Sequence, residues 1–160
     1  MKAGDFEAEG GCACGSIRYR MTSKPLFVHC CHCTWCQRET GSAFVLNAMI
    51  ESKEIEILTG APVAVMTPSE SGQGQKVMRC PDCQVALWSH YSGIGDRVSF
   101  IRVGTLDEPR RIPPDIHIFA STKLPWVEIP KGAPVYEEYY DWRKEWPEAS
   151  QARRLAMKKK

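Results

Sequence analysis

Eight cysteines are the residues whose chemistry stands out, and they fall into three short groups in a chain of 160 residues. The groups are Cys12-Ala13-Cys14, Cys30-Cys31-His32-Cys33-Thr34-Trp35-Cys36 and Cys80-Pro81-Asp82-Cys83. Cysteine thiolates are ligands that Zn²⁺ prefers, and a C-x-x-C step brings two sulfur atoms together in a tight turn. Pairs of this kind from distant parts of a chain can meet around one tetrahedral ion. The spacing therefore predicts zinc binding.

The first and last groups form a natural set of four ligands. Residues two apart in an extended strand share a face, so Cys12 and Cys14 can turn toward the same ion. The turn residues between Cys80 and Cys83 favour a knuckle that would supply the other two sulfurs. We expect these four thiols to hold a structural zinc, because a closed four-sulfur site contributes folding energy directly.

The middle group leaves Cys31, Cys33 and Cys36 for a second zinc ion. Three protein ligands leave the fourth position of a tetrahedral ion open, which is typical of a catalytic metal. Cys30 could close the site instead, but adjacent residues in a strand point to opposite faces, so we expect it not to be a ligand. Its alternatives are a small buried core residue or a redox-active thiol. A second reading of the whole pattern is that both ions are purely structural.

Composition indicates an ordinary globular protein. The chain is 43% hydrophobic and 25% charged with a net charge of +2, which gives no electrostatic reason to expect nucleic acid or an anionic membrane as a partner. Its N-terminus lacks the apolar run of a signal peptide, and no apolar stretch approaches the ~20 residues of a membrane span. We expect a cytoplasmic protein, in which a disulfide scaffold is the less favoured reading of the cysteines.

The elements that must position these thiols are mostly short strands. Runs rich in β-branched and aromatic residues, bounded by turn residues, predict strands at Ser16–Met21, Leu26–His29, Ala43–Ile50, Glu54–Leu58, Val63–Thr67, Gln75–Arg79, Val85–His90, Arg97–Val103 and Ile116–Phe119. Residues 69–74 read as an exposed loop. We expect one mainly β domain over 1–160, of short antiparallel strands with a zinc-ribbon-like element. Its core spans about 11–129, with a small helix at 136–146 and a flexible tail at 150–160.

An ordered set of motifs resembles a known family. The motifs are Gly11-Cys12-Ala13-Cys14-Gly15-Ser16-Ile17-Arg18-Tyr19, Cys31-His32-Cys33-Thr34-Trp35-Cys36-Gln37-Arg38, Gly41-Ser42-Ala43-Phe44, Arg79-Cys80-Pro81-Asp82-Cys83, Gly104-Thr105-Leu106-Asp107, His117-Ile118-Phe119 and Ser121-Thr122-Lys123-Leu124-Pro125-Trp126. Together they resemble the glutathione-dependent formaldehyde-activating (GFA) family, whose relatives include centromere protein V. The chain departs from that pattern at Gln84, where the family usually has glycine.

The resemblance implies a β-rich fold, two zinc ions on the two cysteine sets given above, and a carbon–sulfur lyase activity. The implied reaction condenses glutathione, or a similar small thiol, with formaldehyde or another small aldehyde. The first alternative is a non-catalytic, zinc-stabilised interaction module, and a third reading is a thiol redox protein that uses Cys30. Nothing in the sequence argues against an oligomer.

An anionic thiol substrate needs a cationic anchor, for which motif position indicates Arg38 and Lys123, with Arg18 a further candidate. Each is also a candidate for an ordinary solvated charge. Trp35, inside the ligand loop, is a candidate wall of the pocket or part of the knuckle's packing. His32 is a candidate proton donor, but we expect its ring to point away from the metal, in a packing or surface role. His117 is a candidate lining residue of the site, although we expect a hydrogen-bonded core histidine.

Overall fold

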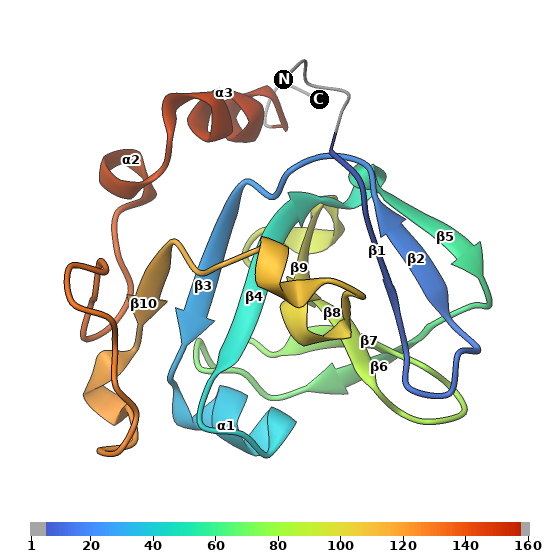
Figure 1. Cartoon of the computed structure of the whole chain (residues 1–160), viewed down its shortest axis with the longest axis horizontal. Helices are drawn as coiled ribbons and strands as arrows, with labels where there is room; N and C mark the ends of the chain where they lie inside the picture. The colour runs from blue at the N-terminus through green and yellow to red at the C-terminus, as the bar shows by residue number, and fades with distance from the viewer. Residues whose placement is uncertain (1–5, 158–160) are drawn as a thin grey trace.

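The computed structural model describes residues 6–157, which form two β-sheets, three short α-helices and several 3₁₀ turns (Figure 1). A sheet of three strands has the order β1-β2-β5, and a sheet of seven has the order β10-β3-β4-β9-β8-β7-β6. The strands are β1 Ala8–Gly11, β2 Arg18–Met21, β3 Phe27–Cys31, β4 Val45–Glu51, β5 Ile55–Thr59, β6 Val63–Thr67, β7 Gln75–Arg79, β8 Ala86–Tyr91, β9 Val98–Arg102 and β10 Ile116–Ile118. Every strand pair is antiparallel except β10 with β3. The expected mainly β fold class is confirmed.

Side chains alternate between the two faces of the large sheet along each strand, and each face contributes to a different buried core. On one face Ala48 and Ile101 pack with Tyr19 of the small sheet, so the two sheets enclose the first core. On the other face Phe27 and Met49 belong to a second core, which includes aromatic residues from the end of the chain. Side chains that follow one another in a strand point to opposite faces, and strand pairing extends each set across the sheet.

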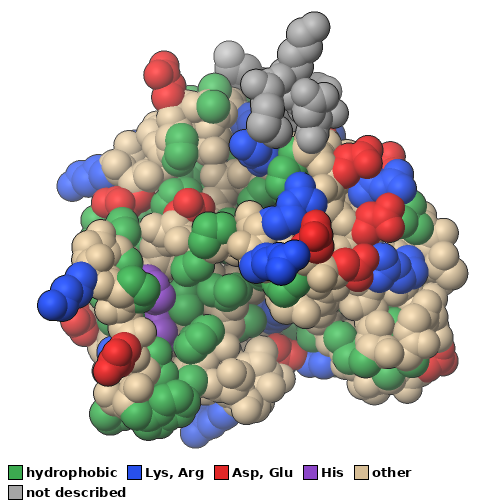
Figure 2. Space-filling view, viewed as in Figure 1, with side chains coloured by type: hydrophobic (Ala, Val, Ile, Leu, Met, Phe, Trp, Pro, Cys, Tyr) green, Lys and Arg blue, Asp and Glu red, His purple; other side chains and the backbone are tan. Residues whose placement is uncertain are grey.

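The charged surface over β1, β2 and β5 carries both signs in close alternation (Figure 2). Arg18 pairs with Asp107 at 2.5 Å, and Arg20 pairs with Glu9 at 2.6 Å. In these ion pairs the positive and negative charges of this face offset one another. None of the helices among residues 6–157 is long and apolar enough to cross a membrane.

The helices differ from the expectation. A first helix, α1 Thr34–Thr40, follows Cys33 within the middle cysteine group, where the sequence suggested only a knuckle. Near the end of the chain, α2 Trp142–Glu145 and α3 Glu148–Met157 replace the helix expected at 136–146.

Residues 150–157, which were expected to begin a flexible tail, belong instead to the helix α3. Pro147 lies between α2 and α3, and its carbonyl accepts the amide N–H of Gln151 of α3 at 3.0 Å. Arg153 of α3 forms an ion pair with Glu51 and donates to the Lys24 carbonyl at 2.9 Å. These bonds dock α3 on the body of the molecule. Lys158, Lys159 and Lys160 lie outside the described residues.

Candidate metal centres and the thiol pocket

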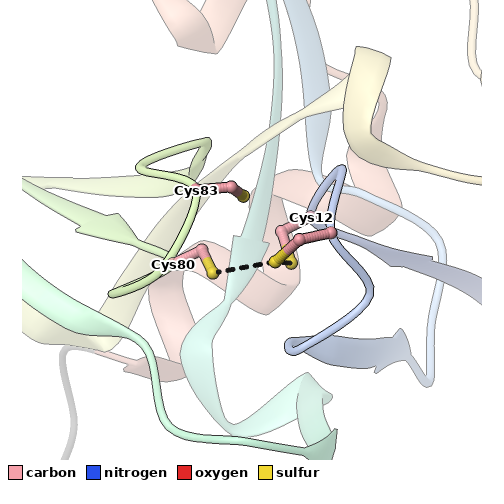
Figure 3. Close-up of side chains that lie close together, drawn as sticks. Cys12, Cys80 and Cys83 are labelled. Carbon is pink, nitrogen blue, oxygen red and sulfur yellow. Dashed lines mark hydrogen bonds between the residues drawn. The ribbon is translucent and has the colours of Figure 1, made fainter.

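The first cysteine cluster joins the turn after β1 to the turn after β7. The ligand atoms of Cys12, Cys14, Cys80 and Cys83 all lie within 4.8 Å of one another. Figure 3 shows Cys12, Cys80 and Cys83 turned toward one another from these two turns. The sulfur of Cys14 is 3.4 Å from that of Cys12 and 3.7 Å from that of Cys80. Four thiolates at ~2.3 Å from a tetrahedral ion would be about 3.8 Å apart, so the set fits zinc.

The departure at Gln84 has a structural explanation. Gln84 has φ 62°, in the left-handed region that glycine adopts without a side-chain penalty. Its side-chain amide donates to the carbonyl of Pro81 at 2.8 Å, and its own carbonyl accepts from Arg79 at 2.9 Å. These bonds offset part of the backbone cost, so the knuckle keeps its shape without glycine.

The second cluster contains Cys31, Cys33 and Cys36, whose sulfur atoms lie within 4.8 Å of one another. Cys31 ends β3, Cys33 is the N-cap of α1, and Cys36 lies in the first turn of that helix. The sulfur of Cys33 accepts the amide N–H of Cys36 at 3.3 Å. The helix therefore folds the loop back on itself, so that three thiols from a six-residue segment converge.

The protonation of this trio supports a metal. Contacts among the three thiols lower the pKa of Cys33 and raise the pKa of Cys31. Three buried thiols in contact cannot all ionise beside one another without a cation, because each negative charge opposes the next. A divalent ion that prefers sulfur would supply that charge, so this donor set also fits zinc.

Cys30 belongs to neither cluster. It points to the opposite face of β3 from Cys31 and lies beside His32 and His117, with its sulfur 3.6 Å from His32 Nε2. His32 Nε2 and His117 Nδ1 are 3.0 Å apart, so one of the two rings donates to the other. His32 is fully buried, which excludes a surface role, and burial raises the pKa of Cys30 to about 12. A disulfide from Cys30 to Cys31 would need the backbone to move.

The three thiols open into a cavity of about 520 Å³, which we call the thiol pocket. It lies on the second face of the large sheet, under the residues that follow β10 and beside the loop between β6 and β7. Cys31, Cys33 and Cys36 line it, as do His29, Asn47 and Met49. The register of β3 and β4 explains why these side chains share the pocket. His29 pairs with Asn47, and Phe27 pairs with Met49 two residues further along the same face. Small-molecule sites commonly have volumes of 300–1,000 Å³, so the thiol pocket is large enough for a small ligand.

Asn47 is oriented by a buried cation behind it. Arg102 pairs with Asn47 across β4 and β9, and its guanidinium donates to the side-chain oxygen of Asn47. Arg102 also donates to Ser89 at 2.9 Å and bridges to Glu39 at 3.4 Å. Because arginine is only a donor, the amide oxygen must face it, and the amide N–H₂ group of Asn47 is left to serve the pocket.

His29 is oriented from the C-terminal segment. The indole N–H of Trp146 donates to the hydroxyl oxygen of Tyr140 at 2.7 Å, and that hydroxyl is 2.6 Å from Nε2 of His29. An indole can only donate, so Tyr140 accepts from Trp146 and its own proton can go to Nε2 of His29; in that arrangement the imidazole proton is on Nδ1. Burial lowers the pKa of His29 to about 4, so the ring is neutral near pH 7.

Comparison with known proteins accounts for this combination of motifs and clusters. A family model described as glutathione-dependent formaldehyde-activating enzyme matches residues 7–122. The chain belongs to the GFA family. A curated protein of Halomonas elongata, named "Putative glutathione-dependent formaldehyde-activating enzyme", is 27% identical over 128 residues, which cover 76% of this chain and 80% of that protein. The resemblance drawn from the motifs is confirmed.

One solved structure adds a distant likeness. A crystal structure of a Rhodobacter sphaeroides protein is 15% identical, covers 62% of this chain and 87% of that chain, and superposes with a TM-score of 0.45. This likeness is too low to carry an argument about the GFA-family chain.

The GFA-family motifs do not supply the cation that lines the thiol pocket. Trp35 lines the pocket, with 38% of its surface exposed. Arg38 is exposed and is not among the lining residues. Lys123 donates its ammonium group to the carbonyls of Leu124 and Val127, at 3.1 and 2.7 Å, and does not line the pocket either.

Arg18 is paired with acidic residues, and the cation that does line the pocket is Arg154 of α3. Sequence reasoning had assigned residue 154 to a flexible tail. Arg154 lies beside Trp142 and Trp146 only because α3 packs next to α2, so no local spacing in the sequence marks it as a pocket residue.

Proposed function

We propose that this protein is a zinc-dependent enzyme of the carbon–sulfur lyase class, which condenses a small thiol with formaldehyde or another small aldehyde. Glutathione, or a thiol like it, is the expected substrate. The observation that carries the proposal is the convergence of three thiols on a pocket of about 520 Å³, with no fourth sulfur, imidazole or carboxylate of residues 6–157 in the same cluster. Membership of the GFA family supports this choice of reaction class.

Cys31, Cys33 and Cys36 would hold the ion. When bound, zinc stabilises the thiolate form of a small thiol, which is the nucleophilic form. Three anionic ligands favour this role over polarisation of a carbonyl, because their charge weakens the ion as a Lewis acid.

The chain's own polar groups would serve the aldehyde. In the reaction a sulfur–carbon bond forms, the carbonyl π bond breaks toward oxygen, and the proton lost by the thiol ends on that oxygen. Negative charge develops on the oxygen before the proton arrives, so donors fixed in advance stabilise it. Two donors among the lining residues would serve this role: the N–H₂ group of Asn47, held by Arg102, and the Nδ1–H of His29, if Tyr140 donates to Nε2.

The test compares Cys33→Ser with Cys30→Ser. Serine is a preferred N-cap, so the first variant removes a sulfur ligand while it keeps the cap of α1. We expect it to bind one zinc ion fewer than the wild type and to form the thiol–aldehyde adduct no faster than the reaction without protein. Cys30→Ser removes a buried thiol outside both clusters and should keep both ions and most of the activity.

Two results would count against the proposal. Full turnover by Cys33→Ser after loss of one ion would remove the second zinc from the mechanism. A wild-type protein that binds two ions and never exceeds the protein-free rate would favour the non-catalytic interaction module.

A further inference from the structure

The guanidinium of Arg154 is held at the wall of the thiol pocket by aromatic rings. Its central carbon lies 4.6 Å from the centroid of the Trp142 ring and 5.3 Å from that of Trp146. Arg154 lines the pocket, as do the three thiols of the second cluster. Stacking on rings restricts the guanidinium but leaves its N–H edges free, which is the geometry that binds carboxylates with two parallel hydrogen bonds.

The charge of Arg154 has no partner in the described part of the chain. No carboxylate of residues 6–157 lies within 4.0 Å of its nitrogen atoms, and its Nε is buried without a hydrogen-bond partner. The neighbouring Arg153 differs, since it bridges to Glu51. Glu70 also lines the pocket but is exposed and forms no ion pair with Arg154.

Another residue of the pocket lining has an unpaired polar atom. Oε1 of Gln75 is buried without a hydrogen-bond partner, and Gln75 lines the same pocket. Buried polar atoms in folded proteins are nearly always paired, so an unpaired donor and an unpaired acceptor around one cavity indicate a ligand that presents both kinds of group.

We propose that Arg154 is the anion anchor of the thiol pocket, so that the preferred substrate is a small thiol that carries a carboxylate. The claim that the substrate is a thiol rests on the proposed function, whereas the claim that it carries a carboxylate rests on Arg154. The anchor comes from α3, outside residues 7–122 that match the GFA family.

The experiment uses thiols that differ in charge. The zinc-loaded full-length protein is assayed with 3-mercaptopropionate, an anion, and with 2-mercaptoethanol, which is neutral. Arg154→Gln should raise KM for the anionic thiol by about ten- to a hundredfold, since one charge-assisted contact is lost. KM for the neutral thiol should change less than about twofold. Arg154→Lys should recover part of the difference, and Arg38→Gln, which removes the same charge outside the pocket, should resemble the wild type.

A second measurement separates the anchor from the chemistry. S-methylglutathione has carboxylates but no free thiol, and its binding can be followed through the fluorescence of Trp142 and Trp146 beside Arg154. Binding that weakens at least tenfold in Arg154→Gln supports the anchor even if no thiol is turned over, in which case only the proposed function fails. If the enzyme is active and Arg154→Gln has wild-type KM values for both thiols, the anchor is overturned and the proposed function stands. Equal losses for both thiols would also overturn it, because they indicate a structural role.

Discussion

Tyr140→Phe tests whether the C-terminal segment is fastened to the large sheet by buried hydrogen bonds. The Tyr140 hydroxyl accepts from Trp146 at 2.7 Å and lies 2.6 Å from Nε2 of His29, and all three residues are buried. Phenylalanine keeps the ring, its packing on Phe27 and its place in the second core. Only the oxygen that joins the two partners is removed.

The loss leaves two buried polar groups without partners, the indole N–H of Trp146 and Nε2 of His29. An orphaned buried group costs about 1–3 kcal/mol, so the two together cost about 2–6 kcal/mol. The more apolar ring recovers part of this, and we expect the free energy of unfolding to fall by about 2–4 kcal/mol. For a chain of this size that corresponds to a fall in Tm of roughly 5–15 °C.

The assay is urea denaturation of zinc-saturated protein, followed by far-UV circular dichroism, with Tyr139→Phe as the matched control. Tyr139 is the preceding residue but is 53% exposed, so loss of its hydroxyl should cost less than about 0.5 kcal/mol. If Tyr140→Phe proves no less stable than Tyr139→Phe, the hydrogen-bonded link between Trp146 and His29 does not contribute as argued.

Three further perturbations test other parts of the fold. Cys80→Ser should cost one zinc ion and lower Tm by more than 10 °C, because a structural zinc site contributes several kcal/mol; metal analysis with Cys30→Ser as control decides this. Gln84→Gly should be more stable than Gln84→Ala by about 1 kcal/mol in urea denaturation, since glycine adopts the left-handed conformation freely, and equal stabilities would refute the strain. Asp107 has a pKa lowered by hydrogen bonds from Arg18, so its contribution is present above its unfolded pKa and is lost as pH falls through the lower folded value. Asp107→Asn should therefore lower the urea midpoint at pH 7, and the difference from the wild type should shrink as pH falls below the ordinary pKa of aspartate; a pH-independent difference would contradict this origin.

The strands could be predicted from the sequence because each repeats a local pattern. Val63–Thr67 and Gln75–Arg79 have the expected bounds, since β-branched runs there end at turn residues. β1, Ala8–Gly11, was missed because Glu-Gly-Gly has little strand propensity, and the strand depends on pairing with β2. The grouping of cysteines into sets of four and three also followed from spacing, and the structure brings both sets together.

The surroundings of the pocket could not be predicted from the sequence, because they depend on tertiary contacts. Nothing near Asn47 in sequence indicates Arg102, which reaches it only through pairing of β4 with β9. The charges near the end of the chain read as solvated, although Arg153 and Arg154 each have a separate tertiary environment. Local patterns thus fix elements, whereas long-range pairing decides which polar side chains share a cavity.

The positions of these residues suggest a division between chemistry and selection. All seven cysteines of the two clusters lie within residues 7–122, the part that matches the GFA family, whereas Tyr140, Trp146 and Arg154 lie beyond it. Under the proposals above, the shared part would hold the ions and the C-terminal segment would orient His29 and recognise the carboxylate. If so, changes in the C-terminal segment should alter KM among thiols of different charge without changing zinc content. Changes in the cysteine trio should abolish turnover for every thiol alike, because they remove the group that all substrates need.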